Sequence, residues 1–338
     1  MTVTPPPAAI DRAKELVMPA LRKAVGRLDP RMALIAGYQL NWNDEHGVPI
    51  AHPGGKALRP TLAVISAEAA GGTAADGVPG AVAVELVHNF SLLHDDLMDR
   101  DLERRHRPTG WRVFGDGQAI LAGNAMLTAA FEALLADGER GARAMPCLTQ
   151  AVQQLISGQS DDLAFEQTPR VLLDDVLRME AAKTGALLAC SASIGAVAVD
   201  APRRVAAGLA AYGAELGMAF QLVDDILGID GDPSITGKSA SSDVRSGKRS
   251  APVVAALNSG TDAGRELSAL LADGPPNSEA QVQRATRLIV EAGGLDWAAR
   301  EADDRLTRAL HHLDALTLPS PTFNELVTLA RYVVARDH

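Results

Sequence analysis

The chain has 338 residues, of which 47% are hydrophobic and 22% charged, and its formal net charge is −10. This composition is ordinary for a globular protein with a large core. The negative charge argues against bulk attraction to nucleic acid or anionic lipid, since both require a basic surface. The two cysteines, Cys147 and Cys190, belong to no CxxC or Cys/His pattern, so neither a disulfide framework nor a zinc site is indicated.

One domain over residues 1–338 is expected, because no change of composition divides the chain. The proline-rich residues 1–10 are expected to be disordered. Charged residues from Asp11 onward interrupt any apolar run, so no secretory signal is predicted. The longest uncharged stretch, Thr184 to Val199, is shorter than the ~20 apolar residues that a membrane helix needs. No transmembrane segment is therefore predicted, and a cytoplasmic location is the default.

Helical periodicity dominates the chain from its start to its end. Residues 37–54 have no clear period and are interpreted as a loop of unknown function between the first two helices. Apolar residues three and four apart predict helices over residues 82–93, 119–135 and 205–226. Clusters of Gly, Pro and Asp mark breaks at residues 48–55, 71–80, 231–237, 274–277 and 319–321. No window alternates convincingly as a strand, so an all-helical bundle is predicted.

A first group of aspartates follows an apolar helical stripe. His88, Asp95 and Asp99 are spaced seven and four residues apart, so at ~100° per residue they share one face. Asp95 and Asp99 would lie about one turn, ~6 Å, apart, close enough to share or bridge divalent cations. Carboxylates are rarely placed in such apolar surroundings without a cation. Asp96 points elsewhere and suits a supporting role.

A second pair, Asp224 and Asp225, ends another apolar helix. If the two helices face each other, their carboxylates would hold several magnesium ions, and magnesium prefers few protein carboxylates plus phosphate oxygens and water. The implied ligand is a diphosphate. Basic side chains suited to bind it are Lys56, Arg59, Arg104, Arg105, Lys183, Lys238 and Lys248.

A di-iron site is an alternative interpretation of the first group. Glu85 and His88 form one Glu-x-x-His element of the kind that di-iron helical bundles use. Such a site needs two of these elements. The chain contains no other, so the di-iron interpretation is disfavoured.

Five motifs occur in a fixed order. They are Gly54-Gly55-Lys56-Ala57-Leu58-Arg59-Pro60, Leu92 to Asp99 with Arg104-Arg105, Lys183-Thr184, Phe220 to Asp225, and Gly237-Lys238 through Asp243 to Gly247-Lys248. In order and spacing they resemble the trans-type polyprenyl diphosphate synthases of the all-helical isoprenoid synthase fold. The resemblance implies a single large helical bundle with a central cavity, a homodimer, and magnesium as cofactor with three ions per active site. It also implies head-to-tail condensation of isopentenyl diphosphate with an allylic diphosphate to a short all-trans product.

The same resemblance implies a role for each motif residue. The metal set would be Asp95, Asp96, Asp99, Asp224 and Asp225. The positions that match contacts to the allylic substrate are Arg104, Lys183, Gln221, Lys238 and Lys248, and those that match the isopentenyl diphosphate site are Lys56, Arg59, His88 and Arg105. The carbonyl of Lys183, Thr184 and Gln221 are the candidates for stabilising the allylic cation as uncharged dipoles.

Two positions depart from the family pattern. Gly228 stands where many relatives carry a third aspartate, and Asp230 or Asp232 is a candidate to compensate. His106 follows the arginine pair where glycine is common. For product length, the positions four and five residues before the first aspartate are Ser91 and Phe90, which favour geranylgeranyl diphosphate (C20) over farnesyl diphosphate (C15). A core-packing role for Phe90 is equally open.

Two other functions compete with a synthase. A class I terpene cyclase shares the aspartate motif but binds one diphosphate, so it would not need Lys56, Arg59 and a paired arginine. It would also carry a glutamate in its second metal motif, which is absent after Asp225. A non-catalytic partner subunit should have lost metal ligands, whereas this chain keeps both aspartate groups. The synthase is therefore preferred.

Overall fold

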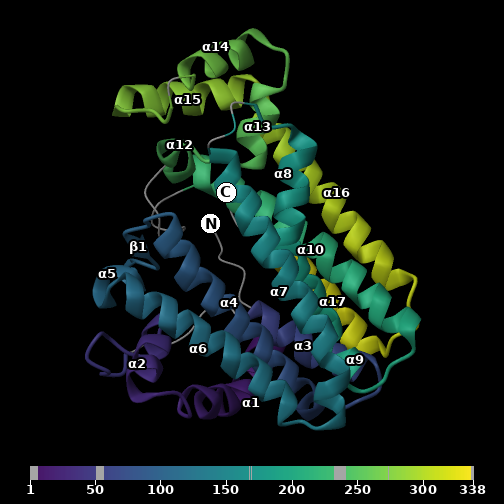
Figure 1. The fold of residues 1–338 in the computed structure, drawn as a ribbon. Helices are drawn as coiled ribbons and strands as arrows, with labels where there is room; N and C mark the ends of the chain where they lie inside the picture. Colours follow the sequence, from purple (N-terminus) through teal and green to yellow (C-terminus); the bar gives the residue numbers. More distant parts are fainter. Residues whose placement is uncertain are drawn as a thin grey trace. The chain divides into compact units, whose positions relative to one another are not determined.

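The structure is a computed structural model that describes residues 7–50, 57–166, 168, 170–231, 241–272 and 274–335. The described chain is helical almost throughout, which confirms the all-helical prediction (Figure 1). Its Cα positions group into two compact units that interleave along the sequence. The first comprises Met1–Val152, Leu187–Gly213 and His311–Leu329, and the second Gln153–Ala186, Ala214–Leu310 and Ala330–His338. The single domain of the sequence analysis stays a prediction.

The helices and strands follow in chain order. In the first half of the chain they are α1 (Ala8–Val25), α2 (Pro30–Gln39), α3 (Leu58–Ala69), the 3-10 turn η1 (Ala74–Gly77), α4 (Val78–Met98), β1 (Glu103–Arg104), β2 (Arg107–Pro108), α5 (Gly110–Phe114), α6 (Asp116–Leu135) and α7 (Glu139–Glu166). In the second half come α8 (Leu173–Glu180), the π-helical turn η2 (Ala181–Gly185), α9 (Ala186–Ala198), α10 (Arg203–Asp230), α12 (Ser242–Ser246), α13 (Ala251–Leu257), α14 (Asp262–Leu270), α15 (Glu279–Glu291), α16 (Gly294–Asp314) and α17 (Ser320–Val334).

The core of the first unit is built around α4. This helix packs against α3 and α6, and its side chains are buried on almost every side between Gly80 and Leu97. Helix α9 reaches α3 because Gly195 has no side chain: a Cβ there would lie 2.3 Å from the backbone oxygen of Ala63. The backbone N–H of Gly195 instead donates to Ser66 Oγ at 3.0 Å. Small residues thus set how closely these helices approach.

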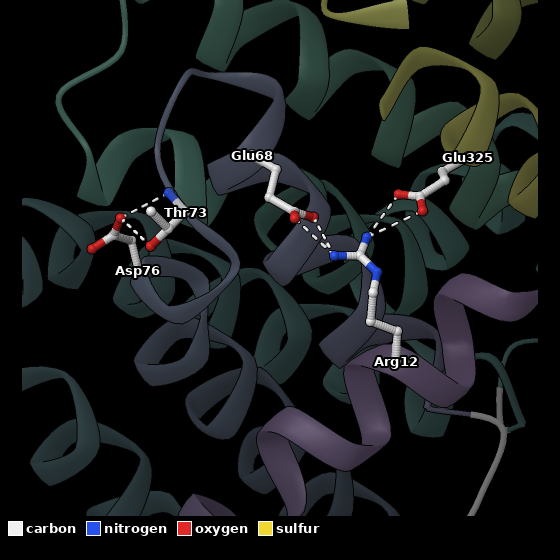
Figure 2. A network of polar contacts seen from close by, with 5 residues as sticks. All are labelled: Arg12, Glu68, Thr73, Asp76 and Glu325. Atoms are coloured by element: carbon white, nitrogen blue, oxygen red, sulfur yellow. Dashed lines mark hydrogen bonds and ion pairs between the residues drawn. The ribbon is translucent and has the colours of Figure 1, made fainter. Parts of the chain in front are cut away.

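A charged network fastens three helices of the first unit (Figure 2). The guanidinium of Arg12 on α1 donates to Glu68 on α3 at 2.7 Å and to Glu325 on α17 at 2.8 Å. Nearby in Figure 2, Thr73 and Asp76 form the capping box that begins η1, with Thr73 N donating to Asp76 Oδ2 at 2.8 Å. Polar contacts therefore set both the start of η1 and the joining of distant chain segments.

The second unit has two hydrophobic clusters. One gathers apolar residues of α8, α10, α13 and α16, among them Met179, Leu222 and Val254. The other joins the end of α10 to α12, α13, α14 and α15 through residues such as Ile229 and Leu288. The amphipathic faces of these helices supply the apolar residues at helical spacing, as the periodicity predicts.

The structure corrects the bounds of two predicted segments and adds one pair of strands. Helix α1 begins at Ala8, and Ala9 and Ile10 are buried, so the expected disorder does not extend over residues 8–10. The unpatterned segment follows the second helix rather than the first, because α2 continues to Gln39. A short antiparallel pair, β1 and β2, also occurs where no strand was predicted, since two residues per strand are too few to show alternation.

The prediction that the chain has no transmembrane segment is not supported by helix length and composition. Judged by length and composition alone, three described helical stretches could cross a membrane: Asp116–Leu135, Leu173–Ala198 and Arg203–Asp230. The sequence analysis considered only Thr184–Val199, which lies largely in the second stretch because α8, η2 and α9 run on without a break. The third stretch carries Glu215, which pairs with Arg305 at 3.2 Å, and charged residues are costly in a bilayer.

Candidate active site

The first aspartate group lies at the carboxyl end of α4. Asp99 caps this helix, and its backbone N–H donates to the Asp95 carbonyl at 2.8 Å. The two residues are therefore one turn apart, as the sequence predicts. Asp99 is exposed and Asp95 partly so, which leaves both accessible to an ion from solvent. Asp96 is instead fully buried at 0% exposure.

Asp96 forms an ion pair with Arg104, the first residue of the arginine pair. Its Oδ1 accepts from Arg104 Nε at 2.6 Å, and the Arg104 side chain is 25% exposed. A buried carboxylate is stable only when a cation and hydrogen bonds compensate its charge, and Arg104 provides both. The predicted metal residue Asp96 thus orients the predicted substrate residue Arg104.

Arg105 and His106 form the two-residue turn between β1 and β2. Both have positive φ, 53° and 59°, which is the left-handed backbone of a tight hairpin turn. Arg107 anchors this hairpin: it donates to Asn41 Oδ1 at 2.8 Å and lies 4.0 Å above the Tyr38 ring. The backbone conformation therefore holds Arg104 and Arg105 in place.

Arg59 and His88 meet in the same unit. Arg59 Nη1 lies 3.3 Å from His88 Nε2. Because arginine can only donate, Nε2 accepts and the histidine proton resides on Nδ1. Desolvation, together with the positive charge of Arg59, holds the pKa of His88 well below its usual value. His88 is therefore neutral near pH 7 and available as a hydrogen-bond donor through Nδ1.

Two hollows adjoin Arg105. The first, about 280 Å³, is lined by Tyr38, Gln39, Asn41, Asp96, Arg104, Arg105, Arg107, Pro108, Thr109 and Gly110. The second, about 490 Å³, is mostly apolar and includes Trp42, Glu85 and Asn89. In the described part of the chain, the buried amide nitrogen Gln39 Nε2 has no hydrogen-bond partner. A donor of this kind beside two arginines suits an anion.

The residues beneath Asp95 face two directions. Ser91 is buried, and its hydroxyl donates to the His88 carbonyl of its own helix at 2.9 Å. Phe90 packs edge-on against His94, with ring centroids 5.1 Å apart. His94 in turn lies so close to α6 that a Cβ on Gly123 would be 2.1 Å from its Nε2. Phe90 therefore belongs to the α4–α6 contact, whereas the small Ser91 lies one turn before Asp95 on the face that bears Asp95.

In the second unit, Lys183 and Thr184 lie on the π-helical turn η2. The extra residue of such a turn opens the regular hydrogen-bond pattern, and π-turns are frequent at functional sites. Lys183 Nζ donates to Asp162 Oδ2 at 2.6 Å. Gly158 allows this approach, because a Cβ there would lie 2.4 Å from the backbone nitrogen of Lys183.

A chain of hydrogen bonds starts at Thr184. Its hydroxyl donates to Gln221 Oε1 at 2.7 Å, and Gln221 Nε2 donates to Asp225 Oδ1 at 2.7 Å. Asp225 also accepts from Ala251 N at 3.2 Å and is 1% exposed. Burial raises the pKa of the Asp225 carboxyl, and its hydrogen bond from Gln221 acts in the opposite direction by stabilising the charged form. The predicted metal residue Asp225 thus fixes the predicted catalytic amide, while the neighbouring Asp224 is only half-buried.

Lys248 lies among acidic groups. The charge of Asp243 is the largest cause of the rise in the pKa of Lys248, and the charges of Asp225, Asp162 and Glu180 act in the same direction. Burial raises the pKa of Glu180 well above its usual value, and Asp225 adds to the rise. Sequence reasoning did not assign roles to Asp162 or Glu180, since each is distant from its partner along the chain, and it included Asp243 in the last motif without giving it a role.

The donor set fits magnesium. No group of three or more His, Cys, Asp or Glu side chains in the described ranges is gathered to hold a metal ion by itself. Magnesium does not require such a group, since it is commonly bound by one or two carboxylates with phosphate oxygens and water. In the first unit the accessible carboxylates of Asp95 and Asp99 supply that number, and in the second unit the half-buried Asp224 supplies one carboxylate. Predicted roles are untested for three residues that lie outside the described ranges, Lys56, Asp232 and Lys238.

Comparison with known proteins points to one family. Residues 41–289 match the family model described as polyprenyl synthetase. The chain is similar to (2E,6E)-farnesyl diphosphate synthase from Mycobacterium tuberculosis, with 47% identity over 96% of this chain and 92% of that protein. Geranylgeranyl diphosphate synthase from the same organism is 41% identical over 98% of this chain and 94% of its own length.

Solved structures agree with the sequence matches. A polyprenyl synthetase from Streptomyces coelicolor A3(2) superposes with a TM-score of 0.93 at 49% identity, covering 97% of this chain and 99% of that chain. A geranylgeranyl pyrophosphate synthase from Corynebacterium glutamicum, solved with isoprenyl diphosphate and magnesium, gives a TM-score of 0.86 at 25% identity, with coverage of 97% and 99%. The predicted fold class is confirmed.

Proposed function

The chain belongs to the polyprenyl synthetase family and is a magnesium-dependent short-chain trans-prenyl diphosphate synthase, and we propose that it makes the C20 product. The observation that supports a C20 product is the small Ser91 one turn before Asp95, while the Phe90 ring packs in the α4–α6 contact. The family membership also favours the synthase over the terpene cyclase and the non-catalytic subunit.

Isopentenyl diphosphate is assigned to the anion-binding groups of the first unit. Arg59 and Arg105 supply fixed positive charge, and neutral His88 adds a donor, so a trianionic headgroup is held by charge-assisted hydrogen bonds. The unpartnered Gln39 Nε2 lies in the hollow beside Arg105 and would add another donor. Lys56 is assigned to the same substrate by resemblance.

The allylic diphosphate is assigned to Arg104, Lys183, Lys238 and Lys248. When bound, magnesium neutralises the charge that develops on the leaving diphosphate. Asp95, Asp99 and Asp224 would hold it, three ions being expected, whereas Asp96 and Asp225 support Arg104 and Gln221. These hydrogen bonds keep the side chains in one geometry before the substrate arrives, which reduces the ordering cost in the transition state.

The allylic cation is assigned to uncharged dipoles. Thr184 commits its only proton to Gln221 Oε1, so the lone pairs of its own oxygen remain to face a positive carbon. Asp225 fixes the orientation of the amide by accepting from Gln221 Nε2. The carbonyl of Lys183 is the third proposed dipole. The released diphosphate takes the final proton, so these residues need only stabilise charge.

A C15 product is the second candidate, because the 47% identical relative is a farnesyl diphosphate synthase and the 41% identical one a geranylgeranyl diphosphate synthase. The deciding experiment incubates the purified protein with magnesium, isopentenyl diphosphate and each allylic diphosphate from C5 to C15. A C20 main product is expected. A product that stops at C15 would refute the chain-length proposal, and no elongation of any starter would refute the residue assignments as well.

Two substitutions separate the roles. Asp95→Ala should reduce kcat by about 10²-fold or more, because a metal ligand is lost, whereas near-normal turnover would contradict its metal role. Phe90→Ala should leave the C20 product unchanged, because the ring packs against His94. Longer products from Phe90→Ala would show instead that this ring forms the floor of the product cavity.

We also propose a cytoplasmic homodimer. Family resemblance supports both, and the apolar side chains of Ile120 and Leu121 on α6 are about half exposed, as a subunit contact would require. Light scattering should give twice the 35.4 kDa chain mass. Leu121→Glu should lower that mass, while a monomeric wild-type protein would refute the dimer.

A further inference from the structure

Two thiols meet inside the first unit. Cys147 on α7 and Cys190 on α9 are 43 residues apart in the sequence, and their Sγ atoms lie 3.3 Å apart. Both cysteines are free thiols. A disulfide bond is about 2 Å long, so the sulfur atoms need to approach by little more than about 1 Å to form one. Their separation is therefore close to that of a bonded pair.

A second contact holds the same two helices together. Nε and Nη2 of Arg143 on α7 donate to the carbonyl of Ala198 on α9 at 3.1 and 2.9 Å. Arg143 lies one turn before Cys147. The neighbouring Ala144 and Leu148 are both fully buried at 0% exposure. The thiols are thus held near each other by packing and by a polar contact.

The two thiols differ in accessibility and in acidity. Cys147 is partly exposed, whereas Cys190 is 3% exposed. A hydrogen bond from the Cys190 thiol is the largest cause that lowers the pKa of Cys147, and one from Ser193, whose Oγ lies 3.7 Å from the sulfur, acts in the same direction against burial. The hydrogen bond to Cys147 and burial hold the pKa of Cys190 well above its usual value. Since the thiolate is the form that reacts with oxidants, Cys147 is the thiol that reacts first.

We propose that Cys147 and Cys190 are a reversible oxidation site, at which a hydroperoxide converts the two thiols to a disulfide that joins α7 to α9. The Cys147 thiolate attacks the peroxide O–O bond, which breaks to release an alcohol or water, and the sulfur becomes a sulfenic acid. The Cys190 sulfur then attacks the Cys147 sulfur, and the hydroxyl leaves as water with the thiol proton. Two electrons pass from the thiols to the peroxide, and a dithiol returns them by exchange.

The test treats the reduced, folded wild-type protein with a small excess of hydrogen peroxide. The chain has two cysteines, so every thiol that is lost belongs to this pair. The intact mass should fall by two hydrogen atoms, and a digest should contain one peptide pair joined through Cys147 and Cys190. Dithiothreitol should restore both thiols. Two thiols that stay free would overturn the proposal, as would oxidation of Cys147 to a sulfinic acid with Cys190 still reduced.

Two variants test the order of the steps. Cys190→Ala removes the second thiol, so oxidation of Cys147 should stop at a sulfenic acid that dimedone traps. Cys147→Ser leaves the buried Cys190, which should give no dimedone adduct at the same peroxide concentration. The opposite pattern, with a reactive Cys190 and an inert Cys147, would overturn the assigned order.

Thermal unfolding tests whether the bond forms within the native contact of the two helices. A disulfide between these cysteines closes a 43-residue interval in the unfolded chain, so the midpoint of the oxidised protein should lie about 3–6 °C above that of the reduced protein. Peroxide-treated Cys147→Ser is the control and should show no rise. Equal midpoints for oxidised and reduced wild type would refute a native link between α7 and α9. None of these measurements uses prenyl transfer, so the inference stands or falls apart from the proposed function.

Discussion

The backbone angle φ of His106 explains why glycine is common at this position in the family. The residue has φ of 59° in a two-residue turn, where a left-handed conformation strains any side chain with a Cβ. His106→Gly should therefore raise the free energy of unfolding by about 1 kcal/mol, as measured by denaturant titration. The contrasting control is His311→Gly in the exposed face of α16, which should lose about 1 kcal/mol. Destabilisation by both would refute the strain at residue 106.

His94 makes stability depend on pH. Burial against α6 lowers its pKa below the 6.5 expected for an unfolded chain. Between the two pKa values only the unfolded state binds the proton, so stability is lost as pH falls below 6.5 and regained as it rises. Each such histidine changes the free energy of unfolding by at most about 1.4 kcal/mol per pH unit. His88 acts in the same sense.

The measurement compares unfolding free energies at pH 7.5 and 5.5. His94→Asn should reduce the difference between the two pH values, because the buried imidazole is gone while His88 remains. His311→Asn, on the exposed face of α16, is the control. An unchanged pH dependence in His94→Asn would show that His94 is not the source.

At the scale of elements, the contact of α7 with η2 positions Lys183. A Cβ on Gly158 would overlap the backbone nitrogen of Lys183 at 2.4 Å, and backbone cannot move aside as a side chain does. Gly158→Ala should cost about 1–3 kcal/mol of stability. By displacing the π-turn it should also lower kcat by about 10²-fold.

Gly117→Ala is the matched control, since its new Cβ meets no atom on α6. It should be neutral or stabilising by about 0.5–1 kcal/mol, the helical preference for alanine over glycine. Steady-state kinetics and thermal unfolding of both variants check the prediction. Wild-type kinetics in Gly158→Ala would mean that the position of η2 does not depend on this contact.

At the scale of the whole molecule, Arg12 joins segments more than 300 residues apart. It binds Glu68 and Glu325, but its side chain is 41% exposed, so solvent screening limits the value of both ion pairs. Arg12→Ala should lower the unfolding free energy by about 1 kcal/mol, with a smaller loss at high salt. Arg265→Ala removes an exposed pair within one helix and should change stability by less than about 0.5 kcal/mol. Equal losses would show that Arg12 gains nothing from joining three helices.

Local spacing along the chain was enough to predict the features that lie within a few residues of one another. Helical periodicity predicted α4, α6 and α10, and four-residue spacing put Asp95 and Asp99 one turn apart, because an α-helix fixes geometry within a few residues. Ordered motifs also predicted the family. Local spacing did not determine product length. That prediction depends on the direction of the Phe90 ring, which packs against His94 and so faces α6, and no local pattern encodes this contact.

Contacts between side chains from distant segments could not be predicted and are seen in the folded chain alone. Asp96 and Asp225 look like further metal residues in the sequence, yet they are buried and bind Arg104 and Gln221. Asp162 reaches Lys183 across 21 residues, and the 43-residue interval between Cys147 and Cys190 leaves their sulfur atoms 3.3 Å apart. Likewise, the structure places Asp243 Oδ2 2.6 Å from where a Cβ on Gly228 would lie. Burial and long-range contact decide these roles, because the free energy of a charged group depends on its neighbours in space rather than in sequence.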